Sequence, residues 1–116
     1  MRSIFSPYTS KNAVGNLSSE EFENKIKNDP QKVLLDVRTV PEHEEVRIPG
    51  SVLIDLYSHD FRNKIESLDK SKSYYLYCRS GNRSQHAAQM MIQMGYENVS
   101  HLAPGIIGWY GEVEEG

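Results

Sequence analysis

The stretch "YYLYCRSGNRSQHAAQM", residues 74–90, contains the single cysteine of the chain, Cys78. The residues before Cys78 are rich in aromatic and aliphatic side chains, which favours a strand over 73–78. After a short polar loop, the apolar spacing predicts a helix over 83–95, whose inward positions are Ala87, Ala88, Met91 and Met94. Cys78 is therefore expected at the carboxyl end of a strand, where a tight loop leads into a helix.

The rest of the chain alternates in the same way between short apolar runs and amphipathic stretches. We expect further strands at 32–37, 98–102 and, after a Pro-Gly turn, within 48–56. Helices are expected at 17–28, where Ser18 and Glu21 have capping-box spacing, and at 59–68; one more helical turn is expected within 104–111. This alternation predicts an α/β fold with a mostly parallel central sheet flanked by helices on both faces. Sites in such sheets lie beyond the carboxyl ends of the strands.

The 116 residues suit one domain spanning 1–116, large enough to bury roughly two thirds of the unfolded surface. Residues 1–16 are expected to be irregular or to add a short edge strand. Residues 112–116, which include three glutamates, are expected to form a short, frayed acidic tail.

Charge and cysteine content exclude several classes of function. The net charge of −3 indicates neither nucleic acid nor an anionic membrane as a partner. One cysteine can form neither an internal disulfide nor a multi-thiolate metal site, and no metal or organic cofactor is implied. The first ten residues lack the apolar core of a signal peptide, and no window is long and apolar enough to span a membrane. A cytoplasmic location is therefore expected.

The loop after Cys78 has the composition of an anion-binding site. Its successive N–H groups, followed by a helix N-terminus, can point at one centre, and Gly81 allows the backbone angles of a tight ring. Arg79 and Arg83 add positive charge. These features favour a thiolate over a buried, inert cysteine. The candidate site comprises Cys78 and the loop residues Arg79, Ser80, Gly81, Asn82, Arg83 and Ser84.

Three segments together resemble the signatures of the rhodanese-type sulfurtransferases. They are "LLDVRTVPEHEEVRIPGS" (34–51), "CRSGNRS" (78–84) and "HLAPGIIGWY" (101–110). The resemblance covers the chain from about residue 17 onward, has the single-domain form, and implies a rhodanese-like fold. One departure is Val46-Arg47, where many relatives have glycine and histidine. Arg83 follows Cys78 after four residues, whereas the related cysteine phosphatases need five, so the smaller ring favours sulfur over a phosphoryl group.

The resemblance implies a two-step reaction. Cys78 takes the outer sulfur of a small anionic donor such as thiosulfate and forms a persulfide. A thiophilic acceptor then removes that sulfur: cyanide in assays, and in the cell a small thiol or a thioredoxin-like protein. Nothing in the sequence specifies an oligomeric state.

The supporting residues have alternative roles. Arg79 is expected to face the donor anion. Arg83 binds substrate, or it pairs with a carboxylate such as Glu42 or Glu45 and holds the loop. Asp36 and Arg38 are expected mainly to brace the end of their strand.

Two further sets of side chains are also open to a packing role. Ile107 and Trp109 line the entrance or simply pack, and the tyrosines of 73–78 are expected to pack within the sheet.

Three other functions remain as alternatives. A non-catalytic rhodanese-like interaction module would not need the complete loop. A cysteine phosphatase or an arsenate reductase is disfavoured by the short loop and by the absence of a second, resolving cysteine. A redox sensor would also use a low-pKa thiolate, so peroxide sensitivity does not discriminate between these functions.

Overall fold

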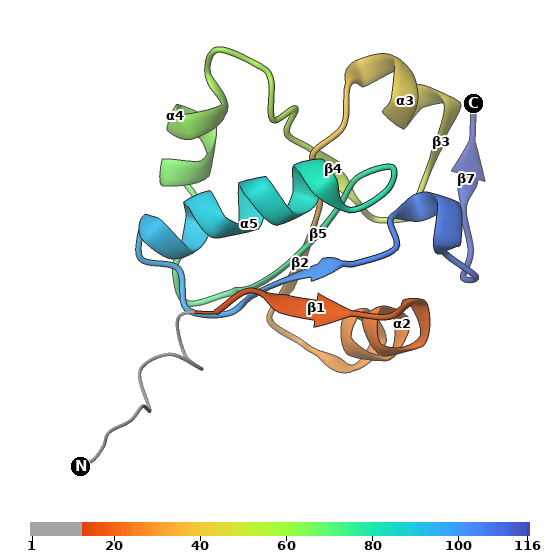
Figure 1. Cartoon of the computed structure of the whole chain (residues 1–116), viewed down its shortest axis with the longest axis horizontal. Helices are drawn as coiled ribbons and strands as arrows, with labels where there is room; N and C mark the ends of the chain where they lie inside the picture. The colour runs from red at the N-terminus through yellow and green to blue at the C-terminus, as the bar shows by residue number, and fades with distance from the viewer. Residues whose placement is uncertain (1–12) are drawn as a thin grey trace.

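In the computed structural model, which describes residues 13–116, five parallel strands form the central sheet (Figure 1). Their spatial order is β1-β6-β5-β2-β4, and every neighbouring pair is parallel. The strands are β1 (Gly15–Leu17), β2 (Lys32–Asp36), β4 (Val52–Leu53), β5 (Ser73–Tyr77) and β6 (Val99–Leu102). The predicted parallel α/β sheet is confirmed, although the strand expected within 48–56 is only two residues long.

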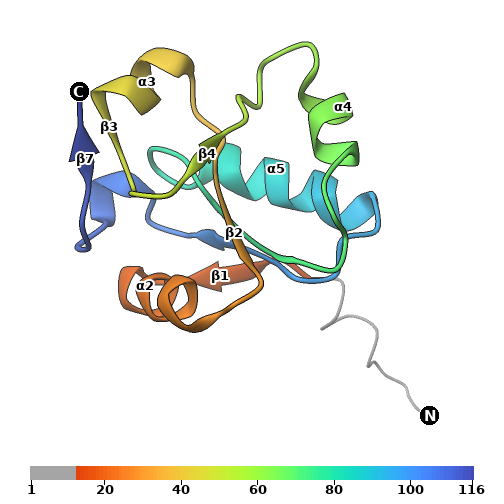
Figure 2. The same ribbon diagram turned by 180° about the vertical axis from the view of Figure 1, so that it is seen from behind.

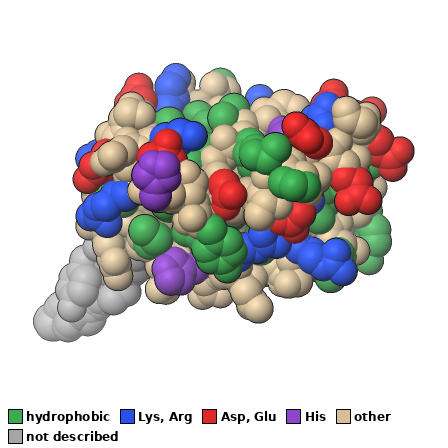
Figure 3. All heavy atoms as spheres, turned by 90° about the horizontal axis from the view of Figure 1, so that it is seen from above, with side chains coloured by type: hydrophobic (Ala, Val, Ile, Leu, Met, Phe, Trp, Pro, Cys, Tyr) green, Lys and Arg blue, Asp and Glu red, His purple; other side chains and the backbone are tan. Residues whose placement is uncertain are grey.

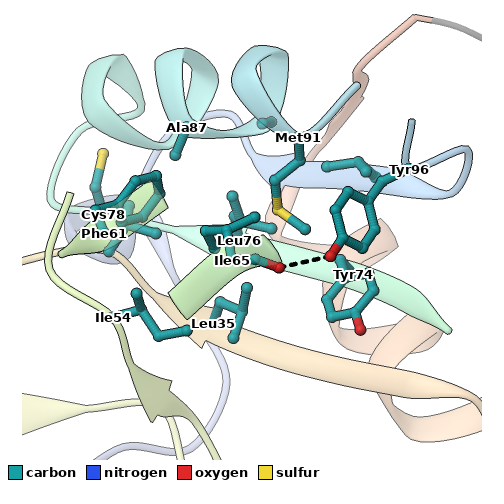
Figure 4. Close-up of a cluster of buried hydrophobic side chains, with 13 residues drawn as sticks. Leu35, Ile54, Phe61, Ile65, Tyr74, Leu76, Cys78, Ala87, Met91 and Tyr96 are labelled. Atoms are coloured by element: carbon teal, nitrogen blue, oxygen red, sulfur yellow. Dashed lines mark hydrogen bonds between the residues drawn. The ribbon is translucent and has the colours of Figure 1, made fainter. Parts of the chain in front are cut away.

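Helices cover both faces of the sheet, as predicted (Figures 1 and 2). Helix α2 (Ser19–Asn28) packs on one face, and α4 (Phe61–Glu66) and α5 (Asn82–Gln93) pack on the other. β5 supplies both cores because alternate side chains of a strand point to opposite faces. Figure 4 shows the core beneath α4 and α5, to which β5 contributes Tyr74 and Leu76, and to which Cys78, directly after β5, also belongs. The side chains of β5 that point to the other face of the sheet, Tyr75 and Tyr77, lie in the core beneath α2.

The predicted helix signals are largely correct. The capping box of α2 is present: the Glu21 N–H donates to Ser18 Oγ at 3.1 Å, and the Ser18 N–H donates to Glu21 Oε1 at 2.9 Å. In α5, Ala87, Ala88 and Met91 are fully buried, whereas Met94 is half-buried just beyond the helix end. These apolar side chains hold α5 against the sheet, and so they fix the position of the loop that precedes it.

One short helix was not predicted, and one short strand matches an alternative that the sequence left open. Helix α3 (Val40–Glu45) lies between β2 and β4, and Thr39 begins it with its N–H donating to Glu42 Oε1 at 3.0 Å. β1 realises the edge-strand alternative for the N-terminal region, because Asn16 pairs with His101 of β6. Residues 1–12, which belong to the same expectation, lie outside the described part of the chain.

The expectation that residues 112–116 form a frayed tail is wrong for Glu114 and Glu115, which form a strand. β7 (Glu114–Glu115) pairs antiparallel with β3 (Val46–Arg47). Arg47 Nε lies 3.3 Å from Glu114 Oε1. The acidic tail therefore has a cationic partner far away in the sequence, which a local analysis of composition does not detect. The helical turn expected within 104–111 is present as η1 (Ile106–Gly108). Over residues 13–116, no helix has both the length and the apolar character needed to cross a membrane.

Candidate active site

Cys78 lies at the carboxyl end of β5, where the loop into α5 surrounds its sulfur. The backbone N–H groups of Gly81 and Ser84 point at Cys78 Sγ, at 3.1 Å and 3.3 Å. The side chain is only 1% exposed. In Figure 4 its sulfur points away from the rest of the core, toward the beginning of α5. The structure thus places the predicted nucleophile within a ring of backbone donors.

Close backbone contacts with the segment after β6 hold this loop in place. The Ile106 N–H donates to the Cys78 carbonyl at 2.9 Å, and the Ile107 N–H donates to the Arg79 carbonyl at 3.2 Å. Gly81 has a φ of 102°, and a Cβ there would lie 2.2 Å from the Ala103 oxygen. A Cβ on Gly105 would lie 2.1 Å from the Arg79 oxygen. Only glycine permits both the positive φ angles and these approaches.

The hydrogen bonds to Cys78 favour its ionised form. Burial by itself raises the pKa of the thiol, and it is the largest single influence. The hydrogen bonds from the Ser84 side chain and from the backbone of Ser84, Gly81 and Ser80 act in the opposite direction and together outweigh it. The pKa of Cys78 is therefore lowered, which makes the thiolate more available for nucleophilic attack.

Ser84 connects Cys78 to two residues that sequence analysis missed, His101 and Asn16. Ser84 Oγ lies 2.7 Å from His101 Nδ1, and His101 Nε2 lies 2.8 Å from Asn16 Oδ1. His101 is 2% exposed, and burial lowers its pKa. A histidine inside the apolar strand predicted at 98–102 was the available signal. Its contact with Asn16 depends on the pairing of β1 with β6.

Arg83 forms a two-point ion pair with Glu42 of α3. Its Nη1 and Nη2 lie 2.8 Å and 2.9 Å from the two carboxylate oxygens. The hydrogen bond from Arg83 is the main reason that the pKa of Glu42 falls to about 2, and the same pair raises the pKa of Arg83. Of the two roles considered for Arg83, the structure contains the pairing role, with Glu42 as the partner.

Asp36 and Arg38 form a buried ion pair at the end of β2. Arg38 donates to Asp36 Oδ1 through Nε at 2.9 Å and to Oδ2 through Nη2 at 2.7 Å. His43 Nδ1 lies 2.8 Å from Asp36 Oδ2, and Arg38 Nη2 also donates to the Val46 carbonyl at 2.6 Å. Burial raises the pKa of Asp36, but the bonds from Arg38 and His43 outweigh it and lower that pKa. These contacts tie β2 to α3 and β3, so Asp36 and Arg38 brace the strand end.

The hydroxyl of Tyr77 extends this brace, so this tyrosine does more than pack within the sheet. It donates to Asp36 Oδ2 at 3.0 Å and accepts from the Ile48 N–H at 3.1 Å. Ser51 Oγ lies 3.0 Å from the same oxygen. The turn that leads into β4 is thus anchored to the strand that carries Cys78.

The residues at the rim of the loop are accessible. Arg79, Ser80 and Asn82 are exposed, and Ile107 is 64% exposed. Trp109 instead packs edge-on against Phe22 of α2, with ring centroids 5.9 Å apart. Ile107 is thus at the surface beside the loop, whereas Trp109 is partly buried and packs against the core beneath α2.

A cavity of about 500 Å³ adjoins the loop through Asn82 and Arg83. Its other lining residues include Tyr57, His59, Arg62 and His86. Viewed from the side of α3 and α4 in Figure 3, histidine and hydrophobic side chains lie among acidic and basic ones. A cavity of similar size, about 530 Å³, lies against α2 and Trp109 and does not include the Cys78 loop.

The chain belongs to the rhodanese family: residues 18–112 match the model of the rhodanese-like domain. A sulfurtransferase from Allochromatium vinosum is 30% identical over 96 residues, which cover 83% of this chain and 88% of that protein. A rhodanese-like domain protein from Staphylococcus aureus has a similar structure, with a TM-score of 0.75 and 25% identity; the match covers 89% of this chain and 99% of that one.

Another relative is considerably longer than this chain. The Bacillus subtilis protein YrkF is 34% identical over 109 residues, which cover 92% of this chain and 58% of YrkF. The chain therefore spans a little over half the length of that relative.

Proposed function

We propose that this chain moves sulfane sulfur from a small anionic donor to a thiophilic acceptor through a persulfide on Cys78. The observation that carries the proposal is the position of Cys78 Sγ, buried and facing the N–H groups of Gly81 and Ser84. Membership of the rhodanese family and the similarity to a sulfurtransferase support the same chemistry.

In the first step, the Cys78 thiolate attacks the outer sulfur of thiosulfate. A sulfur–sulfur bond forms to Cys78, the bond between the two thiosulfate sulfurs breaks, and sulfite leaves with the electron pair. The negative charge then lies on the outer sulfur of the persulfide. Backbone N–H groups of the loop stabilise such charge without reorganising, which typically contributes about 3 kcal/mol for each well-placed donor.

In the second step, a nucleophilic acceptor attacks the outer sulfur and Cys78 leaves as a thiolate. The N–H groups of Gly81 and Ser84 already point at this leaving sulfur. The N–H groups that favour ionisation of Cys78 in the free enzyme therefore also stabilise the Cys78 thiolate as it leaves in this step. Because the two substrates react in turn with one cysteine, ping-pong kinetics are expected.

The exposed residues Arg79, Ser80 and Asn82 are proposed to contact the donor anion at the mouth of the loop. Arg83 forms an ion pair with Glu42, whereas Arg79 forms no ion pair with any residue in the range 13–116. A free guanidinium at the rim is suited to bind a sulfonate-like group through charge-assisted hydrogen bonds. We propose a cellular thiol, either small or carried by a thioredoxin-like protein, as the acceptor. A cytoplasmic location would keep both Cys78 and such a thiol reduced.

Intact mass spectrometry after brief incubation with thiosulfate tests the proposal, with Cys78→Ser as the matched control. The expected result is the gain of one sulfur atom by the wild-type chain alone, reversed by cyanide. If Cys78 gains no sulfur but is alkylated rapidly at neutral pH, thiosulfate is the wrong donor, and mercaptopyruvate and polysulfide are tested in the same way. If Cys78 neither gains sulfur nor is alkylated, the catalytic proposal fails in favour of an interaction module.

A further inference from the structure

A hydrogen-bonded chain runs from the buried sulfur of Cys78 to the exposed edge strand β1. Ser84 Oγ lies 3.5 Å from Cys78 Sγ and 2.7 Å from His101 Nδ1, and His101 Nε2 lies 2.8 Å from Asn16 Oδ1. Ser84 and His101 are 0% and 2% exposed, whereas Asn16 is exposed. The two steps of sulfur transfer described above use neither His101 nor Asn16.

The Ser84 hydroxyl has one proton and several acceptors within reach. Besides Cys78 Sγ and His101 Nδ1, it faces the Gly81 carbonyl oxygen at 3.2 Å. That oxygen already accepts the helical hydrogen bond from the Gln85 N–H at 3.0 Å. A carbonyl oxygen has a second lone pair and can still accept, but the imidazole, at 2.7 Å, is the nearest of these acceptors. Protonation of His101 Nδ1 therefore decides whether the Ser84 hydroxyl donates to the imidazole or turns toward the sulfur.

When Cys78 is a thiol, every polar group of the chain has a hydrogen-bond partner if all the donors point away from the sulfur, toward Asn16. Burial favours a neutral His101, which has one N–H and one acceptor nitrogen. With its proton on Nε2, His101 donates to Asn16 Oδ1 and its Nδ1 accepts from the Ser84 hydroxyl. The oxygen of Ser84 can then accept from the S–H group of Cys78.

When Cys78 is a thiolate, the same arrangement fails, because the Ser84 hydroxyl points its proton at His101 and its oxygen, an acceptor, faces the charged sulfur. Turning the Ser84 hydroxyl toward the sulfur would leave two buried acceptors, Ser84 Oγ and His101 Nδ1, facing each other at 2.7 Å. The conflict disappears if the proton of His101 is on Nδ1 instead. The side-chain amide of Asn16, which has both an acceptor and a donor, can then turn and donate to Nε2.

We propose that Ser84, His101 and Asn16 form the path by which the proton of Cys78 leaves the protein. The thiol proton passes to Ser84 Oγ, the hydroxyl proton passes to His101 Nδ1, and the proton of Nε2 passes to water at the exposed end beside Asn16. One proton leaves Cys78, one reaches the solvent, and His101 is neutral before and after. The chain ends in the reversed direction, with the Ser84 hydroxyl donating to the thiolate.

The charged groups around this path do not disturb its neutrality. Arg83 of α5 interacts electrostatically with Cys78, but its guanidinium is already paired with Glu42 of α3. Arg79 is exposed on the loop, and η1, which packs against the loop, consists of Ile106, Ile107 and Gly108. On β5, Leu76 is the register partner of His101. Among the residues described, only burial shifts the pKa of His101, so no neighbouring carboxylate holds it in the charged form.

Nitrogen-15 NMR of the imidazole of His101, recorded together with the ultraviolet absorbance of the thiolate, tests the proposal. Because Cys78 is the only cysteine, subtraction of the Cys78→Ser absorbance isolates its ionisation. The proton of His101 is expected on Nε2 below the Cys78 pKa and on Nδ1 above it, with the same midpoint. His59 and His86, which are exposed, serve as internal references whose tautomer populations should not follow the midpoint of the Cys78 ionisation. In Cys78→Ser the tautomer should not change with pH.

Ser84→Ala breaks the path without adding bulk to a helix. It should raise the Cys78 pKa by about one unit, and the tautomer of His101 should no longer follow the ionisation. An unchanged NMR fingerprint for the core verifies that this variant is folded. The proposal is wrong if the thiolate forms in the wild type while the proton of His101 stays on Nε2, or if the tautomer still follows ionisation in Ser84→Ala.

The inference rests on the proposed use of Cys78 as a nucleophile, but the two can fail separately. A Cys78 that ionises only at an ordinary thiol pKa counts against the proposed function, and the tautomer is still measured across that transition. A low pKa with no exchange of tautomer counts against the proton path alone.

Discussion

Arg83 of α5 and Glu42 of α3 face each other through two hydrogen bonds, at 2.8 Å and 2.9 Å. The residues are 41 positions apart in the sequence. Both side chains are mostly buried, with 19% and 28% exposed. The pair joins the segment that carries the Cys78 loop to the short helix after β2, and the loop therefore depends on a distant part of the chain for its position.

Glu42→Gln is expected to lower the free energy of unfolding at pH 7 by about 1–2 kcal/mol, allowing for partial exposure of the pair. The pKa of Glu42 is about 2 in the folded protein, below its ordinary value of 4.5. A depressed folded pKa stabilises the protein above the unfolded pKa, and this contribution is lost as the pH falls from 4.5 toward 2. Urea unfolding of both proteins across this range measures it.

The two stability curves should therefore converge at acid pH. Glu23→Gln, which removes an exposed i,i+4 pair with Lys27, is the control and should follow the wild type closely. A constant separation between the Glu42→Gln and wild-type curves from pH 7 to pH 2 would contradict the role given to the ion pair.

Asp36→Asn should be far more damaging, because it leaves Arg38 as a buried charge without its carboxylate. Asp36 and Arg38 are 0% and 3% exposed. Removing one partner of such a pair typically costs about 3–5 kcal/mol, measured as the change in the free energy of urea unfolding. Glu44→Gln, at an exposed position of α3, is the matched control and should change stability by less than about 0.5 kcal/mol. A loss below about 1 kcal/mol in Asp36→Asn would show that water or a rearranged Arg38 relieves the charge.

Gly105→Ala tests whether the close approach of two backbone segments holds the loop of N–H donors around Cys78 Sγ. Gly105 has a φ of 75°, and its added Cβ would lie 2.1 Å from the Arg79 oxygen. Gly50 has a similar φ of 84°, but nothing lies within 4 Å of its added Cβ, so Gly50→Ala measures backbone strain alone. We expect Gly50→Ala to lose about 1–2 kcal/mol of stability and to retain activity. Gly105→Ala should lose more stability and nearly all sulfur transfer, and equal effects in both variants would refute the packing argument.

Arg79→Ala is expected to raise the KM for thiosulfate about tenfold and to change kcat little, because a rim charge binds the donor before reaction. The rate of Cys78 alkylation should retain its pH dependence, since the hydrogen bonds to the sulfur come from other groups. Arg62→Ala removes a cation from the neighbouring cavity and serves as the control. Steady-state kinetics with thiosulfate and cyanide would reject this role for Arg79 if both variants raised KM equally.

Local sequence patterns were sufficient for the parts of the fold that depend on near neighbours. The capping box at Ser18, the run of β-forming residues in β5 and the apolar face of α5 each involve residues within a few positions of one another. α3 was missed because it has no buried residue and therefore no apolar periodicity. The frayed tail was predicted wrongly because Glu114 finds Arg47 only after the chain has folded.

The sequence alone was enough to single out Cys78 as a candidate nucleophile, because its carrier strand, its glycine and its polar loop are contiguous. The three signature segments likewise indicated the family. Only the tertiary structure decided the partners: Glu42 for Arg83, and His101 with Asn16 for Ser84. The physical reason is that hydrogen bonds and ion pairs act over about 3 Å in space, whatever the separation along the chain. The packing of the helices and strands therefore determines which polar groups meet beneath the loop.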